Sequence, residues 1–156
     1  MQNNEAVIRR ALEEAKLVFI ELFRANPHVF MRSTHPLAGK QFVTLKDLEV
    51  YPRLNFIQGS YESSYFAEEL FSTVPSEKNI KVSDRGAIVN LMIGMDAYTI
   101  SSGIYPRYLQ GDRIIAVPLA EDEEMHIGYI LNEKQDLSEL GQIYIEALKK
   151  YGTLNQ

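Results

Sequence analysis

The sequence predicts an α/β fold built around a sheet of parallel strands that are joined by helices. Short apolar runs rich in β-branched and aromatic residues alternate along the chain with segments whose apolar residues recur at helical spacing. The chain has 156 residues, of which 46% are hydrophobic and 24% are charged, as in an ordinary globular protein. A chain of this length makes one domain, or one large domain with an incomplete partner.

The composition argues against several classes of function. The net charge is −5, and binding of a nucleic acid backbone uses clustered Lys and Arg, so we do not expect direct binding of DNA or RNA. The sequence has no cysteine and therefore no disulfide, no thiolate nucleophile and no Cys-ligated metal site. The first stretch, MQNNEAVIRRALEEAK, is polar and charged, unlike a signal peptide or a membrane span, so we expect a cytoplasmic protein.

The expected elements follow one another in a regular order. Strands are expected at 17–23, 28–33, 53–57, 79–83, 97–101, 113–119 and 125–131. Helices are expected at 5–15, 44–48, 62–73, 84–95 and 136–151. Alternating strands and helices are typical of a sheet with helical crossovers, in which ligands bind at the carboxyl ends of the strands.

Capping residues predict where two of the helices begin and end. The segment STHPLAG leaves a strand as a turn, because Pro36 disfavours helix in the residue before it. Thr44 is then expected to cap the helix at 44–48, with Asp47 completing a capping box. Asp136 is expected to cap the last helix and Gly152 to end it. The buried stripe of that helix is expected to consist of Leu140, Ile143, Tyr144, Ala147, Leu148 and Tyr151.

Several of these motifs together resemble a known family. HPLAGKQFVTLKDLEVYPRLNFIQGS, followed by KVSDRGAIVNLMIGMDAYTIS, IIAVPL and a last strand and helix, is similar to the effector-binding domain of LysR-type transcriptional regulators. The resemblance covers roughly residues 17–150. The chain departs from the family pattern at Gly94-Met95-Asp96-Ala97, where a second glycine is usual. It also begins too late to contain the family's winged helix-turn-helix, its linker helix and the first half of the effector domain.

The resemblance implies a fold like that of the type 2 periplasmic binding proteins, with a small ligand between two α/β subdomains. By this resemblance, residues 28–124 form one complete Rossmann-like subdomain II with a hinge strand. Residues 1–27 and 125–156 are then the remnant of subdomain I, and 28–33 and 125–131 are the crossing strands. A sheet without its early strands leaves apolar surface and strand edges uncovered, so we expect a homodimer.

Polar side chains at strand ends and helix starts are candidates for a ligand site. Hydroxyls and free backbone N–H groups at such places suit a small anion, because the donors and the positive end of the helix dipole point the same way. The candidate ligand-binding residues are Arg32, Ser33, Thr34, Gly59, Ser60, Ser63, Ser83 and Asp84. The alternative is that such Ser and Thr residues only cap helices. Asp84 would repel an anion unless Arg85 or Arg32 offsets its charge.

No sequence pattern indicates a metal site, a cofactor or catalysis. His28, His35 and His126 are far apart and lack ligand spacing. The segment EDEEMH is expected to be a charged loop, and no Ser, His and Asp pattern supports a triad. We therefore expect a non-enzymatic effector-sensing domain of a LysR-type regulator, with a carboxylate, an amino acid or an oxyanion as effector. Its contact with DNA is expected only through a domain absent from this chain. The alternative is a stand-alone small-anion binding protein or a small α/β enzyme of the same fold.

Overall fold

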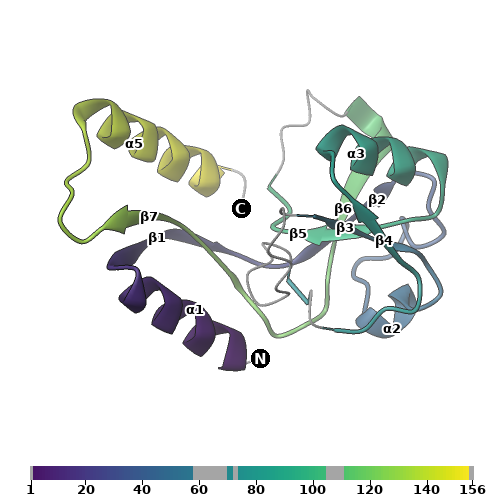
Figure 1. Ribbon diagram of the computed structural model, residues 1–156. Coiled ribbons are helices and arrows are strands. Elements are labelled where there is room, and N and C mark those ends of the chain that lie inside the picture. The colour runs from purple at the N-terminus through teal and green to yellow at the C-terminus, as the bar shows by residue number, and fades with distance from the viewer. Residues whose placement is uncertain (1, 58–69, 72–73, 105–110, 155–156) are drawn as a thin grey trace. The chain divides into compact units, whose positions relative to one another are not determined.

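The computed structural model describes residues 2–57, 70–71, 74–104 and 111–154. The chain forms two compact units, a smaller one of Met1–Ala25 with Met125–Gln156 and a larger one of Asn26–Glu124 (Figure 1). The chain crosses between the units at 25–26 and at 124–125. The boundaries expected from the sequence were 27–28 and 124–125.

The described residues of the larger unit form five strands. They are β2 (His28–Arg32), β3 (Arg53–Phe56), β4 (Asn79–Val82), β5 (Thr99–Ser101) and β6 (Ile114–Pro118), which confirms the five expected strands to within two residues at each end. β2 pairs antiparallel with both β5 and β6, and β3 pairs parallel with β4. A parallel bridge between Arg53 and Tyr98 places β3 beside the chain that enters β5. The order across the sheet is therefore β4-β3-β5-β2-β6, and β2 runs against the other four.

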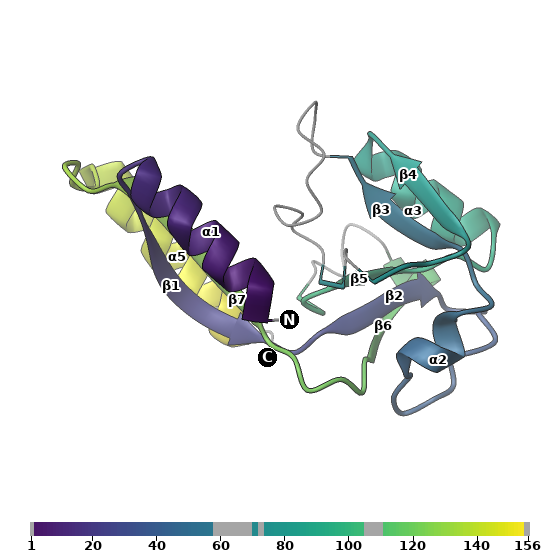
Figure 2. The same cartoon turned by 60° about the horizontal axis from the view of Figure 1, so that its bottom comes forward.

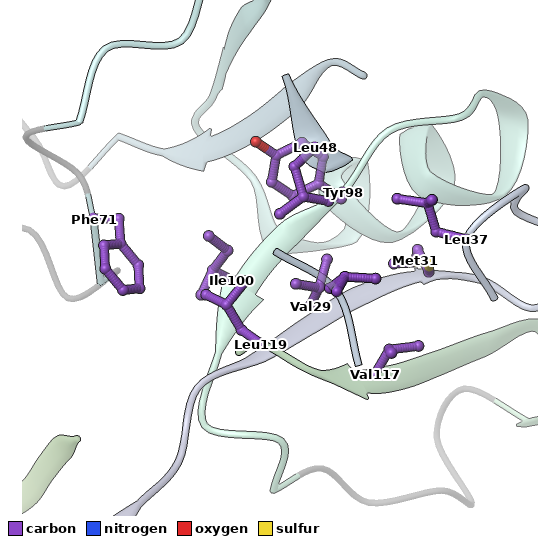
Figure 3. Close-up of a cluster of buried hydrophobic side chains, with 10 residues drawn as sticks. Val29, Met31, Leu37, Leu48, Phe71, Tyr98, Ile100, Val117 and Leu119 are labelled. Atoms are coloured by element: carbon purple, nitrogen blue, oxygen red, sulfur yellow. The ribbon is translucent and has the colours of Figure 1, made fainter. Parts of the chain in front are cut away.

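β2 is buried on both faces of the sheet. Val29 and Met31 point to one face and Phe30 to the other, because successive side chains alternate along a strand. The first face carries the cluster Val29, Met31, Leu37, Val43, Leu48, Phe71, Tyr98, Ile100, Val117 and Leu119 (Figure 3). The second face carries Phe30, Leu54, Val82, Ile88, Met92, Ala97 and Ile114. Burial of one such side chain stabilises the fold by about 2 kcal/mol.

The short helix α2 (Leu45–Leu48) begins with the expected capping box. Thr44 Oγ1 accepts a hydrogen bond from the Asp47 N–H at 3.2 Å, and Asp47 Oδ2 accepts one from the Thr44 N–H at 2.9 Å. Lys40 Nζ lies 2.6 Å from the other carboxylate oxygen. The hydrogen bond from Lys40 and those from Thr44 favour the charged carboxylate, so the pKa of Asp47 falls to about 2. Leu48 is thereby fixed in the first cluster.

The longer helix α3 (Arg85–Gly94) lies against β2, β3 and β4. Ile88 and Met92, one turn apart, insert into the second cluster, and Leu91 packs at its margin. This confirms the helix expected at 84–95. A three-residue 3₁₀ turn at Gly111–Arg113 leads into β6.

Arg53 is a buried cation at the start of β3 that anchors another part of the chain. Its Nη1 donates to the carbonyl of Phe71 and its Nη2 to the carbonyl of Leu70, each at 2.7 Å. Phe71 has φ +61°, a left-handed conformation that costs about 1 kcal/mol in a non-glycine residue. The hydrogen bond to Arg53 and the buried ring of Phe71 offset this cost. Of the helix expected at 62–73, the structure describes residues 70–71, and the others lie outside the described residues.

The smaller unit is built on one antiparallel pair of strands. β1 (Leu17–Ala25) pairs with β7 (Met125–Asn132), and a bulge between Glu21 and Phe23 interrupts the register. Two helices, α1 (Gln2–Glu14) and α5 (Glu139–Leu154), lie on opposite faces of this pair in both views (Figures 1 and 2). Among the side chains described in this unit, the buried apolar ones are Ala25 and Ile145. The unit therefore has a much smaller core than its neighbour.

The boundaries of α5 differ from those expected. The helix begins at Glu139, and its cap is Ser138, whose Oγ accepts a hydrogen bond from the Gly141 N–H at 3.1 Å. Asp136 lies three residues before the helix and does not cap it. The helix also continues through Gly152 to Leu154, so glycine does not end it. Ser138 stands directly before the first helical residue and accepts a hydrogen bond from a free backbone N–H group, which explains why the helix begins later than expected.

The buried face of α5 also differs from the expected stripe. Gly141, Ile145, Leu148 and Gly152 recur at helical spacing and form the less exposed face. A Cβ at Gly152 would lie 2.3 Å from Cε1 of Phe23, so the missing side chain lets the helix approach β1 closely. By contrast, Leu140 is 76% exposed, Ile143 61% and Tyr144 63%. Of the other expected residues, Leu148 lies on the less exposed face and Ala147 is exposed, while the side chain of Tyr151 is outside the described part of the helix. The stripe expected from hydrophobicity is therefore wrong for Leu140, Ile143, Tyr144 and Ala147.

Replacing Gly152 by alanine is expected to destabilise the protein by about 1–3 kcal/mol, because the new methyl group would overlap the ring of Phe23. Alanine normally stabilises a helix relative to glycine, so the sign itself tests the packing. The matched control is Gly94→Ala in α3, where nothing lies within 4 Å of the new Cβ. Urea unfolding of both variants measures the effect, and equal stabilisation by both would contradict the close approach.

Candidate functional site

The carboxyl ends of four strands gather at one edge of the larger unit's sheet. β3, β4, β5 and β6 run in the same direction, so Phe56, Val82, Ser101 and Pro118 end at what we call the carboxyl edge. β2 runs the other way and brings its first residue, His28, to the same edge, opposite Ser101 and Pro118 in register. In open α/β sheets ligands bind at this edge, where strands end and helices begin.

Ser83 and Asp84 lie at the carboxyl edge, between β4 and α3. Asp84 Oδ1 accepts the N–H of Ala87 at 2.8 Å, so Asp84 is the N-cap of α3. Its carboxylate is favourable next to the positive end of the helix dipole, and it occupies a donor that an anionic ligand would otherwise use. Ser83 is exposed beside it and is the hydroxyl at this junction that faces solvent.

A positive charge accompanies these residues. The guanidinium carbon of Arg85 lies 4.4 Å from the centre of the Phe56 ring, a cation–π contact that holds Arg85 next to the end of β3. Arg85 directly follows Asp84 as the first residue of α3. The chain leaves β3 through Ile57, whose N–H donates to the carbonyl of Val82 at 2.8 Å. Gly59, Ser60 and Ser63 follow in the sequence and lie outside the described residues.

Arg32, Ser33 and Thr34 lie at the opposite edge of the sheet. Arg32 pairs with Ile114 at the start of β6, and the Ser33 N–H donates to the carbonyl of Arg113 at 2.8 Å. Because β2 is antiparallel to its neighbours, its last residues lie at the edge away from the carboxyl ends of the other strands. The strand starts, rather than ends, next to the crossing at 25–26. The structure therefore does not bring them together with Ser83 and Asp84.

Arg32 takes part in a polar cluster at that opposite edge. Its Nη2 lies 2.6 Å from Oδ1 of Asp96. Asp96 belongs to the segment 94–97, where this chain lacks the second glycine that is usual in the family. His35 is buried nearby, and its Nδ1 accepts the N–H of Leu37 at 3.1 Å, while its ring packs on Tyr51 with 4.4 Å between ring centres. Burial lowers the pKa of His35, although the charge of Asp96 acts in the other direction. These contacts give Arg32 and His35 a structural role in the HPLA turn.

His28, Ser101 and Ser102 lie at the carboxyl edge and were not among the candidates from the sequence. The direction of β2 decides their position. A parallel connection needs a crossover of a dozen or more residues, usually helical, and the segment between β2 and β3 contains only the four-residue α2. The lack of a full helix at 33–52 is the sequence signal that indicates an antiparallel strand.

Other features of the described residues do not suggest a second site. No three His, Asp or Glu side chains described by the structure lie close enough together to hold a metal ion. A shallow hollow runs along α1 between Glu5 and Glu13, where Arg9 and Glu5 form an exposed ion pair at 2.7 Å. Such pairs along a helix face are worth only a few tenths of a kcal/mol. Within the described part of the chain, no helix combines the length and apolar character needed to cross a bilayer.

Comparison with known proteins identifies the family. A model of the LysR substrate binding domain matches residues 5–152, and no curated protein matches in sequence. The solved structure of HinK, a LysR family transcriptional regulator from Pseudomonas aeruginosa, superposes with a TM-score of 0.64 at 17% identity, covering 87% of this chain and 48% of that one. The effector binding domain of QuiR in complex with shikimate gives 0.62 at 17% identity, covering 90% and 68%. The regulatory domain of MetR from N. meningitidis gives 0.63 at 12% identity, again covering 90% and 68%.

The chain belongs to the LysR substrate binding domain family. Its fold is that of LysR regulatory domains, which confirms the α/β class and the resemblance to type 2 periplasmic binding proteins. It spans about half the length of the HinK structure, and the matched residues hold no separate DNA-binding domain. The family is regulatory rather than enzymatic, in agreement with the sequence analysis.

The lowered pKa of His35 makes a prediction about acid stability. A histidine whose pKa is lower in the folded than in the unfolded state stabilises the fold fully above the unfolded value of 6.5, and this stability is lost as the pH falls below it. His35→Asn keeps an acceptor for the Leu37 N–H and removes the titration. Its unfolding free energy in urea is expected to change less between pH 7 and pH 5 than that of the unchanged chain. Equal pH dependence would show that His35 is not responsible.

Proposed function

We propose that this chain is the small-molecule-sensing part of a LysR-type regulator, and that its effector is a small anion bound at the carboxyl edge of the larger unit. The main support is the direction of the strands, which gathers Ser83, Ser101 and Ser102 at the edge where α/β sheets bind ligands. The guanidinium of Arg85 gives this edge a positive charge. QuiR, which shares the fold, was solved with shikimate, itself a carboxylate.

The sensing mechanism follows from linked equilibria. An effector changes the conformation of a domain only to the extent that it binds one conformation more tightly than another. In the complete cytoplasmic regulator, DNA-binding domains outside this chain respond to that shift. The chain itself carries a net charge of −5, so contact with DNA falls to those domains.

Binding of small anions should raise the thermal unfolding midpoint of the purified chain. The screen consists of sulfate, O-acetylserine, succinate, benzoate and shikimate. A ligand present at 100 times its dissociation constant adds about 2.7 kcal/mol of stability. Ser83→Ala should weaken binding of the active compound roughly 5–10-fold, the value of one hydrogen bond. The matched control is Ser33→Ala, an exposed hydroxyl at the opposite edge of the same sheet, which should leave binding unchanged. No shift with any compound, or a loss confined to Ser33→Ala, would contradict the proposed site.

We also propose that the chain self-associates through the smaller unit. Its described helices and strands expose much apolar surface, including Leu140, Ile143 and Tyr144 on α5. Exposed apolar patches of this kind mark interaction surfaces. A second copy is the partner we propose, because the same patch on both copies gives a closed, symmetric contact.

Sedimentation velocity should find a dimer for the unchanged chain and a monomer for Ile143→Glu, because the charge would be buried in the interface. The matched control is Val50→Glu, which changes an equally exposed apolar residue, 64% against 61% exposed, in the larger unit. The control should remain a dimer. A monomer for the unchanged chain, or dissociation by Val50→Glu alone, would rule out this interface.

A further inference from the structure

We propose that His28 is a ligand-binding residue at the carboxyl edge and that its Nε2 atom is the group that contacts the effector. This inference rests on the proposed function, because it adds a specific residue to that site. His28 is the first residue of β2 and the partner of Ser101 in register. It was considered in the sequence only as a metal ligand, for which it lacks partners.

The hydrogen bond made by the other ring nitrogen fixes the tautomer of His28. Nδ1 lies 2.9 Å from the carbonyl oxygen of Asn26. A carbonyl oxygen can only accept, so Nδ1 carries the proton, and in the neutral ring Nε2 presents a lone pair. No hydrogen bond joins Nε2 to any residue that the structure describes. It can therefore accept a hydrogen bond from a hydroxyl or an ammonium group of the effector.

Gly103 holds the ring in this orientation. A Cβ at this position would lie 2.5 Å from Nδ1 and 2.6 Å from Cγ of His28, so the ring lies directly against the glycine backbone. Gly103 has φ +78°, a conformation that other residues rarely adopt, and the turn before it is closed by a hydrogen bond of 3.3 Å from the Ile104 N–H to Ser102 Oγ. The turn and the contact both require glycine at this position.

A fixed ring at this edge favours binding. A side chain that is already ordered loses less conformational entropy when a ligand arrives. Ser101 is the last residue of β5 and Ser102 follows it. His28 pairs with Ser101, so it lies beside the hydroxyl groups of the proposed site. An ordinary surface histidine would have neither the fixed tautomer nor the glycine turn beneath its ring.

Two isosteric changes separate ligand binding from structure. His28→Asn keeps an amide donor in the place of Nδ1, next to the Asn26 carbonyl, and removes Nε2. His28→Gln places an amide where Nε2 was and gives up the donor to Asn26. Each variant and the unchanged chain are titrated by calorimetry with O-acetylserine, malate and shikimate, carboxylates whose ammonium or hydroxyl groups can donate to Nε2, and their thermal midpoints are measured. His126→Asn, an exposed histidine on β7 in the smaller unit, is the control.

We expect His28→Asn to bind the effective compound about 10-fold more weakly with an almost unchanged midpoint, and His28→Gln to retain most of the affinity. The control should bind the effective compound as tightly as the unchanged chain does. If the unchanged chain binds and His28→Asn binds equally well, the role of His28 is wrong and the proposed function stands. If both His28 variants lower the midpoint and the affinity together, the ring is structural and the inference is wrong. If the unchanged chain binds none of the three compounds, the proposed function fails and this inference fails with it.

Discussion

The larger unit depends on a single strand, β2, which is buried on both faces and runs against its neighbours. Val29 and Met31 join one apolar cluster and Phe30 the other, so this strand belongs to both halves of the core. Its backbone is also paired on both sides, with β5 and with β6. Loss of β2 would therefore remove both clusters and two strand pairings together. The direction of β2 also determines which of its ends lies next to the carboxyl ends of the other strands.

Local interactions explain most of what could be predicted from the sequence. The strand runs are dense in β-branched and aromatic residues, and the capping box of Thr44 and Asp47 is complete within four residues. Interactions between distant segments explain the features that could not be predicted from the sequence. The burial of α5 depends on Phe23, which is about 130 residues from Gly152 in the sequence. A stripe of large apolar side chains on a helix does not reveal that a glycine face packs more closely.

The candidate site shows the same division. Ser83 and Asp84 follow a strand and precede a helix, and this local pattern placed them at the carboxyl edge. Arg32 also follows a strand, but the pattern cannot say which way that strand runs in the sheet. His28 and Gly103 become neighbours only through the register of β2 with β5, and the positive φ of the glycine is a property of the folded backbone. Pairing between strands, rather than residue type, decides which polar groups meet.

Arg53 anchors a distant part of the chain through backbone carbonyl groups. Residues 58–69 connect two fixed points, the hydrogen bond of Ile57 to Val82 and the two hydrogen bonds of Arg53 to Leu70 and Phe71. Neither point involves a side chain of the connecting segment. Both fixed points use backbone atoms of the chain that they hold, so a single side chain, that of Arg53, determines where residues 70–71 lie against β3.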